Sequence, residues 1–123
     1  MRGVDVRIII PHIPDKKYAF ELSRACASSM SHSGIKFYEY TPGFMHAKSM
    51  VCDNEVFIGT YNFDFRSLRL NYECGVIFGS EICEQVERDF SDSVRLSQPF
   101  TPAKVKPFRS VYRFFLKLFA PLF

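Results

Sequence analysis

The strongest constraint on the fold is a strand–helix–strand pattern at the start of the chain. The run VDVRIIIP, Val4 to Pro11, is rich in β-branched residues and predicts a strand. The segment from Lys16 to about His32 carries apolar residues at helical spacing, and Asp15 is its expected N-cap. The alternating run IKFYEY, Ile35 to Tyr40, predicts a second strand. A helix between two strands is typical of a βαβ unit, so we expect a parallel pair.

The remainder of the chain predicts further strands and two helices. We expect strands over residues 45–52, 56–60 and 70–78, with a tight DNE turn after the first of them. A helix capped by Ser80 should run to about Ser97, and a Pro-interrupted linker follows it. The predicted fold class is therefore α/β, a mixed β-sheet flanked by helices, with a C-terminal amphipathic helix. We expect one domain over residues 1–98, with the linker and helix over residues 99–123.

Composition restricts the possible partners. A chain of 123 residues with 47% apolar residues is long enough for one compact domain. The net charge of +3 is a mild bias toward anionic partners, and the chain lacks a strong basic stripe, so no nucleic acid is expected. We interpret the opening run as a short strand and do not expect a secretory leader, and no apolar run approaches the ~20 residues of a membrane-spanning helix. The four cysteines have no metal-ligand spacing and are interpreted as buried and reduced.

The stretch HAKSMVCD places a histidine and a lysine two residues apart in a predicted strand. Residues i and i+2 of a strand share a face, about 6.6 Å apart, so His46 and Lys48 should project side by side. A buried lysine needs a partner, and an ammonium beside an imidazole fits a site that receives an anion. The alternative is a core histidine with a lysine whose head reaches solvent.

Polar residues at matching offsets strengthen the first interpretation. Thr60 and Asn62 are again two apart and can donate to phosphate oxygens without carrying charge. Glu73 lies in a predicted strand, and a carboxylate can fix the tautomer of a nucleophilic histidine. Asp53 has the opposite parity and falls in the DNE turn, so a turn-forming role is as plausible as a functional one.

These residues together resemble a known family. The run HAKSMVCD resembles the HKD motif of the phospholipase D superfamily, and GTYNFDFRSLRLNYECGVIF is similar to its continuation in bacterial cardiolipin synthases. The runs VRIIIPHIPDKKY and FFLKLFAPLF also resemble that subfamily, so the resemblance covers nearly the whole chain. The family usually has six residues between the motif aspartate and the glycine, whereas five separate Asp53 from Gly59 here.

The resemblance implies a phospholipase D-like fold for residues 1–98 and a phosphatidyltransferase reaction of the cardiolipin synthase type. A phosphatidyl group would pass between phosphatidylglycerol molecules through a phosphohistidine, with no metal or organic cofactor. By motif match, the implied catalytic residues are His46, Lys48, Asp53 and Glu73, with Glu73 orienting His46. The implied phosphate-binding residues are Lys48, Thr60 and Asn62. The implied location is the bacterial cell membrane, peripheral in this chain.

A single HKD motif is present, and the chain matches the C-terminal half of the two-half family layout. The implied partner is a second HKD half, which is either an N-terminal half or a homodimer partner. Two alternatives stay open: a phospholipase D-like phosphodiesterase or nuclease that works as a homodimer, and an inactive truncated fragment.

The last residues predict an amphipathic basic helix, which suits either a membrane surface or packing within the protein. Its apolar positions are Val111, Phe114, Phe115, Leu118, Phe119 and Leu122, opposite Arg109, Arg113 and Lys117.

Overall fold

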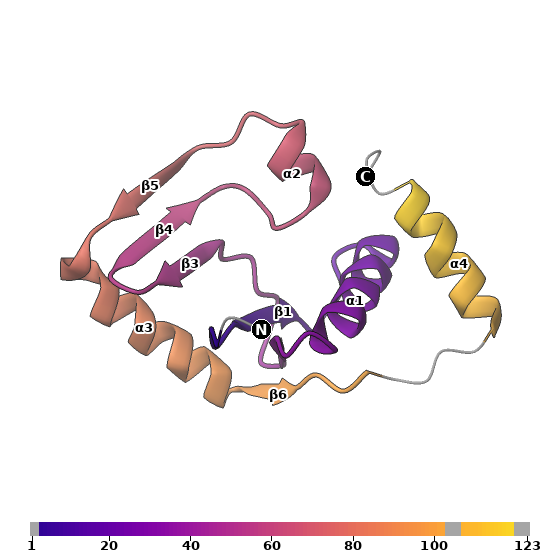
Figure 1. The fold of residues 1–123 in the computed structure, drawn as a ribbon, viewed down its shortest axis with the longest axis horizontal. Coiled ribbons are helices and arrows are strands. Elements are labelled where there is room, and N and C mark those ends of the chain that lie inside the picture. Colours follow the sequence, from indigo (N-terminus) through magenta and orange to yellow (C-terminus); the bar gives the residue numbers. More distant parts are fainter. Residues whose placement is uncertain (1–2, 103–106, 120–123) are drawn as a thin grey trace.

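The structure is a computed structural model that describes residues 3–102 and 107–119. The described residues form four helices and six short strands (Figure 1). In chain order the elements are β1 (Arg7–Pro11), α1 (Lys17–Ser31), β2 (Lys36–Tyr40), β3 (Ser49–Cys52), β4 (Glu55–Gly59), α2 (Phe65–Arg69), β5 (Gly75–Phe78), α3 (Ser80–Arg95), β6 (Ser97–Pro99) and α4 (Pro107–Leu118). The predicted α/β class is confirmed.

The first sheet confirms the βαβ unit. Strands β1 and β2 pair in parallel, with Ile9 opposite Tyr38, and α1 connects them. The expected N-cap is wrong, because Lys16 occupies that position and its side chain makes no capping hydrogen bond. The helix ends before Gly34, whose φ of +87° suits a residue without Cβ. Strand β6 (Ser97–Pro99) was not predicted, because it lies where we expected the helix to end and the linker to begin. It completes the order β1-β2-β6 by pairing antiparallel with β2.

The second sheet is an antiparallel meander of β3, β4 and β5. We expected a single mixed sheet, whereas the strands divide into two three-stranded sheets. The strands β3 and β5 are shorter than predicted, beginning at Ser49 and Gly75. The sequence analysis did not predict helix α2. Asp64 caps this helix by accepting a hydrogen bond of 2.7 Å from the Ser67 amide. An aspartate at the N-cap position is a helix-start signal that can be read from the sequence.

Helix α3 connects the two sheets, because it follows β5 and leads directly into β6 (Figure 1). It packs against strands of both sheets. Its predicted inner face, Ile82, Val86, Phe90 and Ser93, is half-buried, and Cys83 beside that face is buried. The Thr41 hydroxyl, just after β2, donates to the Leu96 carbonyl at the end of α3 over 3.0 Å. This hydrogen bond links the start of the loop that carries His46 to the end of α3.

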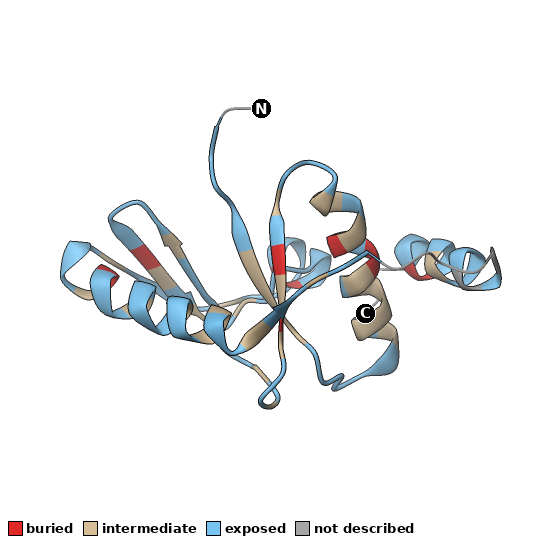
Figure 2. Cartoon of the chain, turned by 90° about the horizontal axis from the view of Figure 1, so that it is seen from below, coloured by how far each residue is buried: buried red, intermediate tan, exposed pale blue. Residues whose placement is uncertain are grey.

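The hydrophobic core is small for a chain of this length (Figure 2). Its buried apolar residues are Ala25, Ala27, Phe37, Val56, Cys83 and Leu116. All four cysteines are free, but three of them, Cys26, Cys52 and Cys74, are exposed, so our interpretation of them as buried is wrong. Many large apolar side chains are also exposed, which is typical of a surface that a further partner covers. Among the described helices, none has the length and apolar character needed to span a bilayer.

Candidate active site

His46 lies in the loop between β2 and β3 rather than in a strand. Our prediction of a buried strand there is wrong, because β3 begins only at Ser49 and the His46 side chain is exposed. The imidazole stacks against the Phe44 ring, with 5.6 Å between the ring centroids and 27° between their planes. The Phe44 ring therefore covers one face of the imidazole, while the His46 side chain as a whole stays exposed.

Lys48 follows two residues later and is half-buried. Its ammonium Nζ donates to the His46 carbonyl oxygen over 2.7 Å. The Lys48 carbonyl in turn accepts a hydrogen bond of 3.1 Å from the Gly59 amide, so pairing with β4 continues one residue beyond β3. Pairing with β4 therefore fixes the backbone of Lys48, and the ammonium group of Lys48 folds back toward His46.

A shallow hollow of about 240 Å³ brings these residues together with the end of β4. It is lined by His46, Lys48, Gly59 and Thr60. Gly59 is required there, because a Cβ atom would come within 2.7 Å of the Cys74 carbonyl oxygen and would overlap the Phe57 ring. The hollow thus combines an imidazole, an ammonium and a hydroxyl at one open surface, which suits an anion.

Thr60 belongs to a hydrogen-bonded group that also includes Glu73. The Thr60 hydroxyl donates to Glu73 Oε2 over 2.7 Å, and the Asn71 amide donates to Glu73 Oε1 over 3.3 Å. The Thr60 hydroxyl, followed by the Asn71 amide, holds the pKa of Glu73 below its ordinary value of 4.5, with a smaller contribution from the Lys48 charge. Glu73 is therefore ionised at neutral pH and fixes the position of the threonine that faces the hollow.

Two residues in this group were missed by the sequence reasoning. Arg66 Nε donates to Asn71 Oδ1 over 3.2 Å, which orients the Asn71 amide toward Glu73. The short helix α2 positions Arg66, so recognising its Asp64 cap would have revealed the link.

The other predicted site residues lie apart from the hollow. Asn62 is exposed and does not line it. Asp53 has a φ of 52° in the β3–β4 turn, seven residues beyond His46, which is about 23 Å along extended chain. Its carbonyl accepts a hydrogen bond of 3.3 Å from the Cys83 thiol. Among the described residues Glu73 makes no hydrogen bond to His46, because its oxygens accept from Thr60 and Asn71.

The fold and the hollow define a class: an α/β domain with a histidine, a lysine and a threonine around one open hollow. A family model described as "Cardiolipin synthase, PLD-like domain" matches residues 1–94. The chain belongs to this phospholipase D-like family.

Curated proteins similar to the chain include two cardiolipin synthases. That of Halalkalibacterium halodurans is 47% identical over 59% of the chain and 15% of its own length. That of Geobacillus thermodenitrificans is 36% identical over 89% of the chain and 22% of its own length. An uncharacterised protein of Streptococcus mutans is 37% identical over 98% of the chain and 27% of its own length. The chain thus spans about a quarter or less of these relatives. No solved structure matches it significantly.

Proposed function

We propose that the chain supplies the C-terminal half of a phosphatidyltransferase site of the cardiolipin synthase type. The observation that carries the proposal is the hollow that joins His46, Lys48 and Thr60 at the edge of the second sheet. The family assignment supports the same chemistry. Residues 1–98 would form this catalytic half, and residues 99–123 would form the linker and terminal helix.

In the proposed reaction His46 attacks the phosphorus of phosphatidylglycerol. A nitrogen–phosphorus bond forms while the bond from phosphorus to the glycerol oxygen breaks, and a histidine of the second HKD half protonates the leaving alcohol. A hydroxyl of another phosphatidylglycerol then attacks the phosphohistidine, gives its proton to that second histidine, and releases His46. The products are cardiolipin and glycerol, so every atom and proton is balanced.

The remaining residues would bind and position the phosphoryl group. Lys48 and Thr60 would hold its oxygens as charge develops, because fixed donors act best when they are placed before the reaction. Asn62 would add a third donor once the second half closes the site. Support of His46 by Glu73 stays a prediction, since Glu73 holds Thr60 in this structure. Asp53, at the far turn, is assigned a role only by the motif match.

Reconstitution with phosphatidylglycerol vesicles tests the proposal. The chain alone should give little or no product, and a supplied N-terminal half should restore cardiolipin formation. In the restored pair, His46→Ala should lower the rate on the order of a thousandfold or more. The matched control is His32→Ala, because His32 is also exposed but lies at the end of α1. Unchanged cardiolipin formation with His46→Ala would contradict the assignment.

The homodimeric phosphodiesterase or nuclease stays a second candidate because the chain carries one motif, and a two-fold axis would bring two together. Sedimentation separates the candidates: a monomer at micromolar concentration excludes a symmetric site at that concentration.

A further inference from the structure

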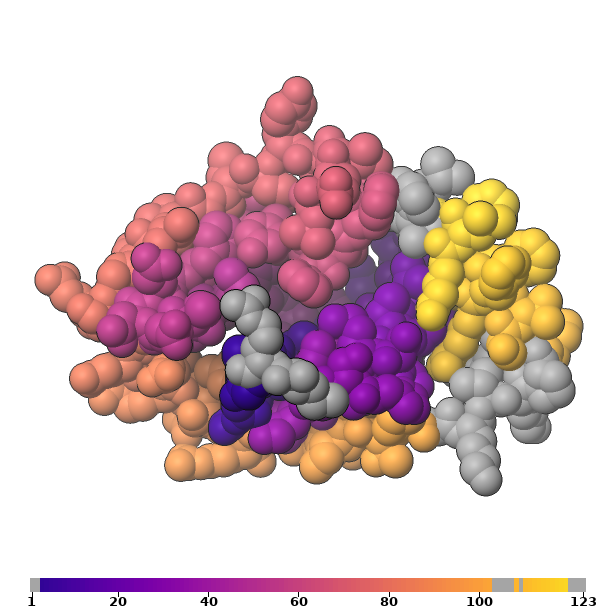
Figure 3. Space-filling model, in the orientation of Figure 1, coloured from indigo at the N-terminus to yellow at the C-terminus, as the bar shows by residue number. Residues whose placement is uncertain are grey.

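The terminal helix α4 leaves a crevice where it meets α1 (Figure 3). Two interactions hold it there. Leu116 is buried, and Arg113 Nε donates to Glu21 Oε2 over 3.2 Å, with both charged side chains about 15% exposed. The predicted basic face of α4 therefore turns partly toward α1. The side chain of Arg109 and the whole of Leu122, which we assigned to the two faces, lie outside the described part of the chain.

The crevice between the two helices has a volume of about 280 Å³. Its lining consists of two cations, two hydroxyl groups and two apolar side chains: Arg113, Lys117, Ser28, Ser110, Ala25 and Phe114. Cationic groups beside hydroxyl donors match the oxygens of a phosphate diester. Arg113 is already paired with Glu21, whereas Lys117 makes no ion pair within the described ranges. Lys117 is thus the cation that can neutralise an incoming phosphate.

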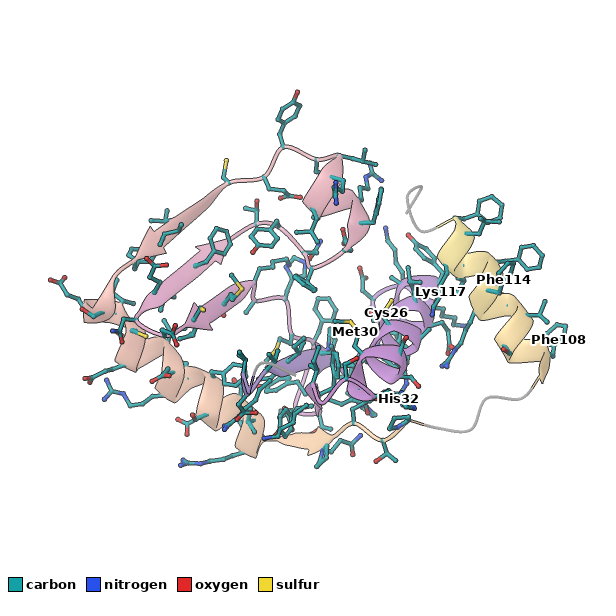
Figure 4. The ribbon with its side chains drawn as sticks, viewed as in Figure 1. Cys26, Met30, His32, Phe108, Phe114 and Lys117 are labelled. Atoms are coloured by element: carbon teal, nitrogen blue, oxygen red, sulfur yellow. The ribbon has the colours of Figure 1, made fainter. Side chains whose placement is uncertain are left out.

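The side of α4 that faces away from the crevice is apolar and exposed. Phe108 belongs to it and is 88% exposed, whereas Phe114 lies at the edge of the crevice with its ring directed outward, 65% exposed (Figure 4). Val111, Phe115 and Leu118 on the same helix are each more than half exposed. An amphipathic helix with aromatic residues on one face and cations on the other can lie in the interface of a bilayer.

Charge complementarity identifies an anionic bilayer as the surface that covers this face. Residues 96–123 contain no aspartate or glutamate, whereas their cations are Lys104, Lys106, Arg109, Arg113 and Lys117. Cations near an anionic leaflet contribute about 1 kcal/mol each to membrane binding.

We propose that the α1–α4 crevice binds the phosphate group of an anionic phospholipid in a bilayer while the aromatic face of α4 enters the acyl boundary. The choice of phosphatidylglycerol as the probe rests on the proposed function. The site itself is separate from the hollow at His46, because it is formed by other elements. A phospholipid held there is not the reacting molecule and anchors the domain beside its substrate.

Vesicle sedimentation with the 123-residue chain tests the proposal. The chain should bind vesicles of equal phosphatidylglycerol and phosphatidylcholine at least tenfold more tightly than vesicles of phosphatidylcholine alone. The double variant Ser28→Ala/Ser110→Ala should weaken binding to the anionic vesicles about tenfold, since two hydrogen bonds are lost without a change in charge. Lys117→Ala should weaken it at least as much, and Lys117→Arg should restore most of the binding.

A matched control and the choice of variants separate the crevice from general attraction and from catalysis. Lys17→Ala removes the same charge from an exposed position of α1 outside the crevice and should change binding less than twofold. None of the crevice variants changes a residue of the hollow at His46, so a failed transferase assay leaves this test intact. Circular dichroism on each variant confirms that the helices are retained.

Three outcomes would overturn the proposal. If the double serine variant binds like the parent chain, the helix docks by charge alone and the crevice holds no phosphate. If 10 mM inorganic phosphate displaces the chain from vesicles and the serine variant abolishes that effect, the ligand is a soluble phosphate. If the chain does not bind anionic vesicles but sediments as an oligomer, and Phe114→Ser converts that oligomer to a monomer, the exposed face of α4 is a protein interface.

Discussion

Glu39 provides the sharpest test of how this small fold is held together. It lies in β2, seven residues before His46, and its side chain is 5% exposed. Three groups surround its carboxylate: Arg24 donates to Oε1, Gln98 Nε2 donates to Oε2 over 3.0 Å, and His12 Nδ1 lies 3.1 Å from Oε2. The carboxylate therefore connects α1, β6 and the end of β1 to the middle of the first sheet.

The cost of Glu39→Ala follows from what the substitution leaves behind. The Arg24 guanidinium, 22% exposed and lying over the Phe20 and Phe100 rings, would lose its counter-charge. Breaking a buried ion pair costs about 3–5 kcal/mol, and the partial exposure of Arg24 puts the expected loss near the lower limit. A domain of this length has a free energy of unfolding of about 6–18 kcal/mol, so about 3 kcal/mol is a large share. The melting temperature should fall by roughly 12 °C.

The assay is thermal and urea unfolding followed by circular dichroism. Glu84→Ala is the matched control, because Glu84 is 84% exposed and lies 3.9 Å from Arg88, so its loss should cost less than about 0.5 kcal/mol. Arg24→Met combined with Glu39→Ala should recover part of the loss, since the unpaired charge is then absent. Equal unfolding midpoints for Glu39→Ala and the control would refute the reasoning.

Three further predictions concern the site and the cysteines. Thr60→Ala should raise the pKa of Glu73 toward 4.5, because the hydroxyl that stabilises the carboxylate is lost, and carboxyl NMR titration measures the change. Because the pKa of Glu73 is lower in the folded state, ionised Glu73 stabilises the fold at pH values above its unfolded pKa. This stabilisation is lost as the pH falls through the folded pKa. The Thr60→Ala variant should therefore show a smaller stabilisation from Glu73. Gly59→Ala should destabilise the chain by about 1–3 kcal/mol in urea unfolding, because the new Cβ meets the Phe57 ring and a neighbouring carbonyl. Cys83 should resist alkylation at pH 8 while the other three cysteines react, because burial raises the pKa of the Cys83 thiol and only the other three are exposed; labelling of four thiols at one rate would contradict this.

The sequence predicted the parts of the fold that depend on local pattern. The βαβ unit, the β3–β4 hairpin and helix α3 all follow from periodicity and turn residues. Strand β6 could not be found in this way, because the segment Ser97–Pro99 has no strand pattern and becomes a strand only by pairing with Tyr38 to Tyr40 of β2. The predicted strand at residues 45–52 is shortened for the same reason. Its first residues, which include His46, pair with no neighbouring strand, so β3 begins only at Ser49.

The same limit applies to the site. The i, i+2 spacing indicated that His46 and Lys48 would act at one place, and they do line one hollow with Thr60. The partner of Glu73 could not be chosen from the sequence, since a histidine and a threonine are both chemically suitable. The spacer between Asp53 and Gly59 is one residue shorter than is usual in the family. Thr60 nevertheless lines the hollow, after a two-residue turn between β3 and β4.

The openness of the hollow explains why the chain alone should turn over slowly. Fixed donors stabilise developing charge best where water is excluded, because the local dielectric is then low. Here His46 and Thr60 are exposed. The segment that follows them carries large uncovered apolar side chains, with Phe63 73% exposed and Tyr72 fully exposed. A second half that covered this surface would bury apolar area and exclude water from the phosphate in the same step. Binding of that half and activation of His46 should therefore rise together, and a titration in which activity saturates at the same concentration as complex formation would confirm the coupling.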